Sequence, residues 1–125
     1  MTEAKKEKQK KKLVELGLMD EKETLIDFLQ ATHAAKRIPG SWAQGWIYFS
    51  DEKIIYPTGA LSDNIVIPYS SIQSISKCNQ GLFPMGIAIT YLDPASGKTE
   101  KEKFAMTKRK KWIDFISEKS GVALS

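Results

Sequence analysis

The stretch 45–57 constrains the fold of this chain more than any other. It holds two runs rich in aromatic and β-branched residues, Gly45–Phe49 and Lys53–Tyr56, with the polar turn Ser50–Lys53 between them. Such side chains suit a pleated surface, and Ser and Asp bond to nearby backbone amides in turns. The stretch predicts an antiparallel hairpin. Because an isolated hairpin is marginal in water, other segments must add strands.

Five further segments have the composition of strands. The first also places Leu25, Phe28 and Leu29 on one helical face, so a helix is the alternative there. A clear turn at 93–97 separates the last two. In chain order, the expected strands are Glu23–Ala34, Ala43–Phe49, Lys53–Tyr56, Ile65–Pro68, Ser71–Cys78, Met85–Tyr91 and Thr99–Met106.

A helix is expected near each end of the chain. Residues 3–16 are good helix formers, and Gly17 is placed to end them in a Schellman motif. We expect the apolar side chains at its end to dock on the body; these are Leu13, Leu16 and Leu18.

The second helix is predicted over Lys108–Lys119, with Thr107 as its N-cap and Gly121 at its end. Its large apolar side chains fall on one stripe, which predicts that this face is buried. The stripe consists of Trp112, Ile113, Phe115 and Ile116.

Several motifs occur in a characteristic order. They are Gly45-x-Ile47-Tyr48-Phe49-Ser50-Asp51, Ile65-Val66-Ile67-Pro68-Tyr69-x-x-Ile72-x-x-Ile75, Gly86-Ile87-x-Ile89-Thr90, and Phe104 followed by Arg109-x-x-Trp112-x-x-Phe115-Ile116. Together they resemble a GRAM domain of the pleckstrin-homology superfamily. The resemblance implies a strongly bent antiparallel sheet of seven strands, closed by a C-terminal helix, and favours a strand at the first segment. It implies a domain over 23–121, preceded by a basic helix in 1–22.

The net charge of +4 is concentrated at the N-terminus. Residues 1–12 hold six Lys and two Glu, and from Leu13 onward 13 basic and 13 acidic residues cancel. A neutral body disfavours a nucleic-acid-binding domain, so weak sequence-blind binding through the Lys tail is a minor alternative. The single Cys78 excludes an internal disulfide and fits a cytoplasmic setting. No apolar run approaches the roughly 20 residues that span a bilayer.

Residues able to perform catalysis are sparse. With one His and one Cys, the chain offers no zinc-ligand set. We expect His33 to have a structural partner, and Glu100 and Glu102 to be solvated. The sequence therefore predicts a non-enzymatic protein without a cofactor or a metal.

Two basic clusters are candidate sites for anions or lipids. The Lys tail is either a solvated helix or a means of attraction to an anionic membrane, where each lysine contributes about 1 kcal/mol. The second cluster opens the C-terminal helix, where the helix dipole disfavours cations. Either an acidic patch such as Glu100 and Glu102 lies opposite, or the helix start binds an anion. This cluster is Lys108, Arg109, Lys110 and Lys111.

The resemblance adds a third basic candidate. In pleckstrin-homology domains that bind phosphoinositides, the loop between the first two strands carries basic side chains, and Lys36 and Arg37 stand in the matching loop. The second strand lacks the basic partner expected there. Asp63 and Asp93 fall on loops that should flank the same site, which disfavours a polyanionic headgroup.

The turn before the sixth strand is apolar. Leu82, Phe83 and Met85 either fold under the sheet or are exposed as a partner-binding site, including a homodimer contact. The sequence thus predicts a cytoplasmic binding module for a protein partner or an anionic phospholipid surface at the inner face of the membrane. A self-associating interaction domain is the alternative.

Overall fold

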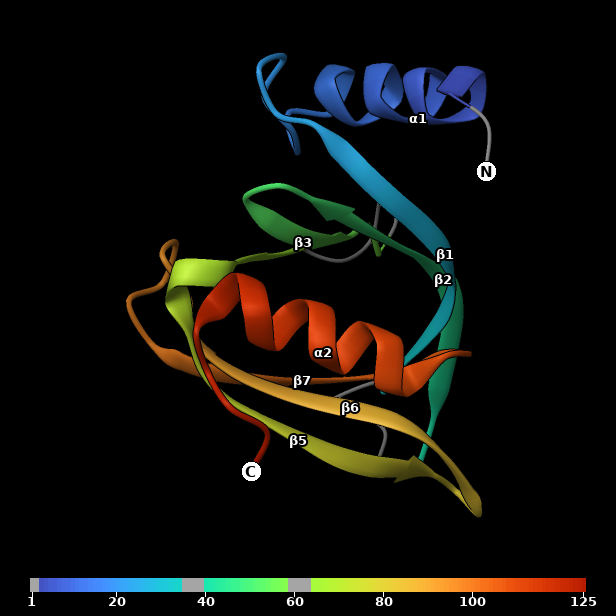
Figure 1. The fold of residues 1–125 in the computed structure, drawn as a ribbon, viewed down its shortest axis with the longest axis vertical. Helices are drawn as coiled ribbons and strands as arrows, with labels where there is room; N and C mark the ends of the chain where they lie inside the picture. The colour runs from blue at the N-terminus through green and yellow to red at the C-terminus, as the bar shows by residue number, and fades with distance from the viewer. Residues whose placement is uncertain (1–2, 35–39, 59–63) are drawn as a thin grey trace.

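A computed structural model of the chain describes residues 3–34, 40–58 and 64–125 (Figure 1). Its elements are α1 (Glu3–Glu15), β1 (Leu25–Ala34), β2 (Trp42–Ser50), β3 (Lys53–Tyr56), β4 (Ile65–Pro68), the 3-10 turn η1 (Tyr69–Ser71), β5 (Ile72–Gln80), β6 (Phe83–Leu92), β7 (Thr99–Ala105) and α2 (Arg109–Ser120). Within these ranges, seven strands form one antiparallel sheet in the order β4-β3-β2-β1-β7-β6-β5. The predicted fold class is confirmed, and the first segment is a strand.

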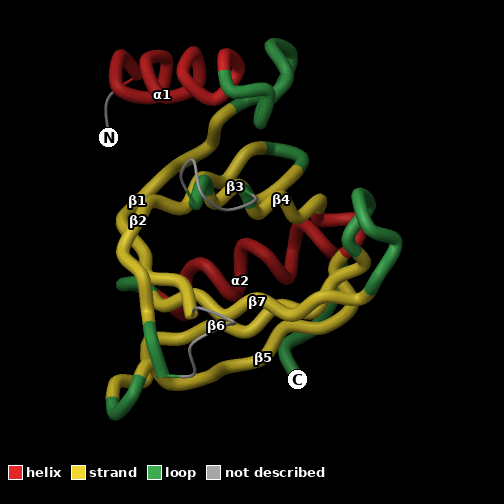
Figure 2. The backbone as a smooth tube through the Cα atoms, turned by 180° about the vertical axis from the view of Figure 1, so that it is seen from behind, coloured by secondary structure: helices red, strands yellow, loops and turns green. Residues whose placement is uncertain are grey.

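The sheet bends sharply between β1 and β7. These strands pair over only Thr32–Ala105 and His33–Phe104, whereas β1 and β2 pair along their whole length. Strands β1–β4 and β5–β7 therefore form two walls, and α2 lies across the opening between them (Figures 1 and 2). No helix in the described ranges is long and apolar enough to span a bilayer.

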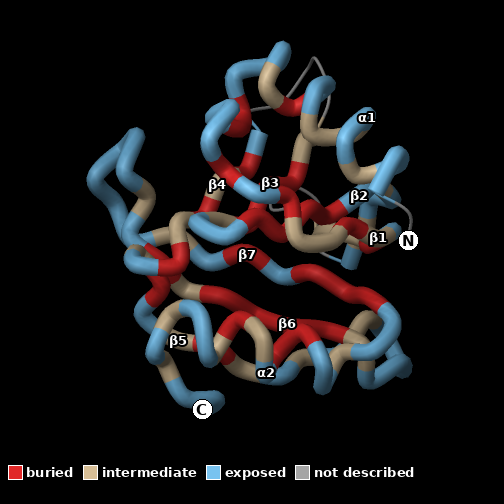
Figure 3. The backbone as a smooth tube through the Cα atoms, turned by 45° about the horizontal axis from the view of Figure 1, so that its top comes forward, coloured by how far each residue is buried: buried red, intermediate tan, exposed pale blue. Residues whose placement is uncertain are grey.

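The core fills the space between the two walls and α2. Figure 3 shows a long buried run in β6, a short one in β3 and alternating buried positions in β7. Trp112, Ile113 and Ile116 of α2 are buried, and Phe115 packs partly against them, so the predicted stripe is confirmed. The Trp112 ring stacks on Phe49 with centroids 4.3 Å apart and an interplanar angle of 3°. Such aromatic contacts add to the burial of apolar area.

A second apolar cluster joins α1 to the outer side of β1, β2 and β3. The helix ends in the predicted Schellman motif: Leu18 N donates to Leu13 O and Gly17 N to Val14 O, each at 3.0 Å. Leu13 and Leu18 are buried as expected, but Leu16 is 58% exposed, so its predicted docking is wrong. The hydrophobic contact of this motif joins Leu13 and Leu18, and Leu16 lies between them on the outside of the turn.

The segment after α1 is tied to the β2–β3 turn. Glu23 Oε1 lies 2.7 Å from Lys53 Nζ and accepts a hydrogen bond from Asp20 N. Thr24 N donates to Asp51 Oδ1, and Asp51 N donates back to Thr24 O. These polar contacts fix the entry of the chain into β1.

Candidate functional site

The β5–β6 hairpin ends in an exposed apolar tip. Gln80 pairs with Phe83, so the turn contains only Gly81 and Leu82. Gly81 has φ +60°, as the first central position of a type II′ turn requires. This turn is shorter than the sequence predicted and leaves no chain to fold its side chains underneath. Leu82 is 96% and Phe83 65% exposed, whereas Met85 is half-buried.

The start of α2 lies beside this hairpin. Met106 N donates to Met85 O at 3.1 Å, which extends the sheet up to the helix. Lys108 then adopts a left-handed conformation, with φ 56° and ψ 42°, and occupies the N-cap without a side-chain hydrogen bond. The predicted N-cap Thr107 is therefore wrong. Because Lys108 is left-handed, the helix starts at Arg109 and its N-cap is Lys108. Thr107 lies one residue too early to cap it.

Arg109 connects α2 to the stem of the hairpin. Its Nη1 donates to Cys78 O at 3.2 Å and to Gly86 O at 3.5 Å. This guanidinium is committed to holding the helix start against β5 and β6. Lys108, Lys110 and Lys111 are exposed, and Lys111 Nζ lies 4.7 Å from the Trp112 ring centroid. The exposed cations of the predicted cluster are thus the three lysines.

The acidic patch expected opposite this cluster is not formed by Glu100 or Glu102. Glu102 points into the interior, and Glu100 lies opposite Tyr91 near the start of β7, the end of the strand that is remote from the first turn of α2. The first turn of α2 itself contains no acidic residue. Three exposed cations therefore stand at a helix start where the dipole disfavours them, by about 0.3–1 kcal/mol each.

We name the segments 76–87 and 105–113 the basic–apolar edge. They contain five Lys or Arg and no Asp or Glu, together with the exposed apolar tip. In Figure 1 the hairpin tip and the first turn of α2 both lie on the right of the molecule. The sequence presented these as two separate candidates about 25 residues apart, and the fold joins them. Lys36 and Arg37, the third candidate, lie outside the described residues.

Replacing Lys108 by Gly is expected to stabilise the chain by about 0.5–1 kcal/mol, because a left-handed residue with a Cβ is strained. Urea denaturation followed by circular dichroism would measure the change. Lys111→Gly is the matched control: this exposed lysine lies inside α2, where Gly is expected to destabilise by a similar amount. Destabilisation by both substitutions would contradict the strain at Lys108.

A small pocket of about 150 Å³ adjoins the edge. It separates the β1–β2 ribbon from the base of the β5–β6 hairpin. The buried Oγ1 of Thr32 faces no hydrogen-bond partner within the described ranges. The pocket is lined by Gln30, Ala31, Thr32, Gln44, Gln80, Met85, Ala105, Met106 and Thr107.

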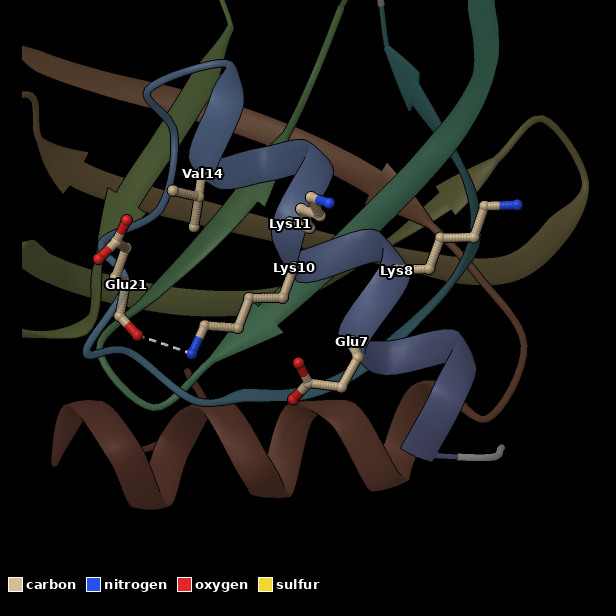
Figure 4. Close-up of a pocket in the computed structure, with 6 residues that line it drawn as sticks. All are labelled: Glu7, Lys8, Lys10, Lys11, Val14 and Glu21. Carbon is tan, nitrogen blue, oxygen red and sulfur yellow. Dashed lines mark hydrogen bonds between the residues drawn. The ribbon is translucent and has the colours of Figure 1, made fainter.

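The lysines of α1 border a different, open pocket (Figure 4). Lys8, Lys10 and Lys11 line it together with the acidic residues Glu7 and Glu21. Lys10 Nζ donates to the backbone carbonyl of Glu21 at 2.8 Å. Because both signs of charge meet here, this pocket has a weaker attraction for anions than the basic–apolar edge.

His33 belongs to a network in the interior. Its Nε2 lies 2.9 Å from Glu102 Oε1, and the Tyr91 hydroxyl donates to Glu102 Oε2 at 3.0 Å. Burial, followed by the charge of Glu102, raises the pKa of Tyr91. The His33 ring also packs against Tyr56 and Phe104, so its predicted structural role is confirmed. The expectation of a solvated Glu102 is wrong, because Glu102 alternates in step with Phe104 on the interior face. Among the described residues, no three His, Cys, Asp or Glu side chains form a metal site.

No protein-family model matches the sequence, and no curated protein matches it. Solved structures do match. The C-terminal domain of an unknown protein from Leishmania infantum has 14% identity and a TM-score of 0.65, over 91% of this chain and 95% of that domain. The Slm1 PH domain in complex with inositol-4-phosphate has 8% identity and a TM-score of 0.58, over 77% and 95% of the two chains.

The DH/PH domains of PDZ-RhoGEF, solved in complex with activated RhoA, give a third match. The identity is 9% and the TM-score 0.65, over 88% of this chain and 33% of the larger protein. At these identities the similarity concerns the fold. The chain has a pleckstrin-homology-like fold, as its motifs predicted.

Proposed function

We propose that this chain is a non-enzymatic binding module, GRAM-like in its motifs, that attaches to anionic phospholipid at the cytoplasmic face of a membrane. Its contact residues are Lys108, Lys110 and Lys111. The module spans 23–121, and the basic helix in 1–22 packs on its outer side.

The observation that carries this proposal is the exposed lysine triplet at the start of α2, whose first turn contains no acidic residue; the nearest one on the helix is the exposed Asp114. Cations at this position cost stability in isolation. A bound anion would offset this cost in stability, because it would contact both the lysines and the N–H groups of the first turn. A phospholipid surface presents many such anions side by side, so it can contact all three lysines at once.

The fold supports a binding role in general. Among its structural neighbours, the Slm1 PH domain holds an inositol phosphate and the PDZ-RhoGEF domains hold RhoA. Self-association through Leu82, Phe83 and Met85 is less favoured. Met85 is half-buried, so only Leu82 and Phe83 are exposed. The area of two side chains is far below the roughly 800 Å² that each partner buries in a standard interface.

Sedimentation with vesicles tests the lipid role. The chain is expected to bind vesicles of phosphatidylcholine with phosphatidylserine at low salt, to lose them as salt rises, and to ignore pure phosphatidylcholine. Replacing Lys108, Lys110 and Lys111 together by Gln should weaken binding about 100-fold, since three lysines contribute about 3 kcal/mol.

The matched control removes three exposed lysines of α1, by Gln at Lys8, Lys11 and Lys12. It changes the net charge equally and is expected to have a much smaller effect. Equal recovery of the unmodified chain with neutral and anionic vesicles would exclude the lipid role. If the α1 variant lost more vesicle binding than the α2 variant, the lipid contact would have to be assigned to α1.

A further inference from the structure

We propose that Leu82 and Phe83 insert into the membrane as an apolar anchor, while the lysines of α2 remain among the headgroups. This inference rests on the proposed lipid binding and adds a second, hydrophobic component to it. The anchor is the tip of the β5–β6 hairpin, a part of the basic–apolar edge.

The tip of the hairpin is narrow and apolar. Its two-residue turn places Leu82 almost entirely in solvent at the extreme end of the hairpin, with Phe83 beside it. The stem is held by its strand pairing, which is irregular between Cys78 and Gln80, by the hydrogen bond from Met106 N to Met85 O, and by the Arg109 guanidinium on the Cys78 and Gly86 carbonyls. Insertion therefore requires no ordering of the hairpin, which lowers its entropic cost.

The charge of the basic–apolar edge favours an anionic membrane as its partner. The whole basic–apolar edge carries five cations and no acid, which is complementary to anionic lipid. The opposite end of β6 leads into the loop that contains Asp93, and Glu100 lies nearby on β7. Lys98 belongs to the same loop and Lys101 follows Glu100, so this end of the sheet carries both signs of charge, whereas the basic–apolar edge carries one. Lysine stems near the tip can pack along apolar surface while their ammonium groups stay in water.

The size of the tip also favours lipid over protein. A stable protein interface needs many residues, and the apolar part of this tip consists of two. Insertion into a bilayer does not require a large complementary surface, because acyl chains surround each protruding apolar side chain. Membrane affinity then adds the buried apolar area to the electrostatic attraction.

The test compares two variants on phosphatidylcholine and phosphatidylserine vesicles. Leu82→Ser with Phe83→Thr keeps a residue suited to the turn and one suited to the strand, and is expected to lower the partition coefficient about 10- to 100-fold. Leu92→Ser is the matched control, because Leu92 is 45% exposed at the other end of β6. It is expected to bind as the unmodified chain does. Thermal denaturation should give similar midpoints for all three, since the altered side chains are exposed.

A fluorescent probe locates the tip. An environment-sensitive fluorophore is attached to Leu82→Cys, or to Leu92→Cys, in a chain with Cys78→Ser. On anionic vesicles the label at 82 is expected to shift to the blue and to be quenched by lipids carrying acyl-chain quenchers, and the label at 92 is not.

The outcomes separate the two proposals. If the unmodified chain ignores anionic vesicles, both fall. If it binds and the tip variant binds equally well, the anchor is refuted while the lipid role of the lysines stands. The anchor is also refuted if the label at 82 stays in water, or if light scattering shows that the tip variant only converts a dimer into a monomer.

Discussion

Replacing Trp112 by Ala is expected to lower the free energy of unfolding by about 3–5 kcal/mol. The indole is buried between the walls of the sheet, stacks on Phe49 and meets Phe115 edge-on at 5.5 Å. Its removal leaves a large cavity where both halves of the sheet meet α2. Because domains of this size are stable by only about 5–15 kcal/mol, the variant should be close to unfolded. Urea denaturation followed by far-ultraviolet circular dichroism would measure the loss.

Trp112→Phe provides the control. The indole Nε1 is buried and faces no hydrogen-bond partner in the described part of the chain, so its removal sacrifices no bond there. Phe keeps an aromatic ring against Phe49, and we expect a loss of about 1–2 kcal/mol. A loss below 1 kcal/mol for Ala would show that α2 does not close the sheet.

Alkaline pH is expected to destabilise the chain steeply above pH 10. Burial raises the pKa of all four tyrosines, assisted at Tyr69 by the charges of Asp51 and Glu23 and at Tyr91 by Glu102. The tyrosines of the unfolded chain lose their protons near pH 10, while those of the folded chain retain them. Stability is therefore complete below pH 10 and falls as the pH rises toward the folded-state pKa values. Each tyrosine contributes up to about 1.4 kcal/mol per pH unit, so Tyr69 and Tyr91, whose pKa values are raised most, could together remove up to about 3 kcal/mol by pH 11.

Denaturation midpoints between pH 8 and 11 would measure this dependence. The control replaces Tyr69 and Tyr91 by Phe, which cannot ionise, and is expected to lose stability less steeply than the unmodified chain as the pH rises. An unchanged slope in that variant would contradict the assignment of the alkaline loss to Tyr69 and Tyr91.

The regular elements were predictable because their signals are local. The alternation and turn residues around the first hairpin, and Pro68 at the end of a short strand, set the bounds of β3 and β4. The Gly17 ending of α1 and the stripe led by Trp112 also depend on nearest neighbours in a helix. The interior position of Glu102 could have been found in the same way, since it shares its strand face with Phe104.

The composition of the candidate edge could not be predicted locally. Arg109 reaches carbonyls of two strands, and this contact exists only once the sheet has bent. The left-handed Lys108 follows from that packing and has no propensity signal, since Lys does not favour this conformation. A local rule could have found the short turn at Gly81, but the apolar residues after it fitted a buried and an exposed position equally well.

The outer strands of the sheet bear on whether neighbouring copies of the molecule can pair edge to edge. At one margin, β4 is only four residues long and finishes at Pro68. At the other, Ser125 N donates to Ile75 O at 2.8 Å, and Leu124 runs parallel to β5, so the C-terminal residues shield part of that strand. Unshielded margins invite intermolecular strand addition and amyloid-like aggregation. Crowded copies of the chain should therefore remain separate and not join into a continuous sheet.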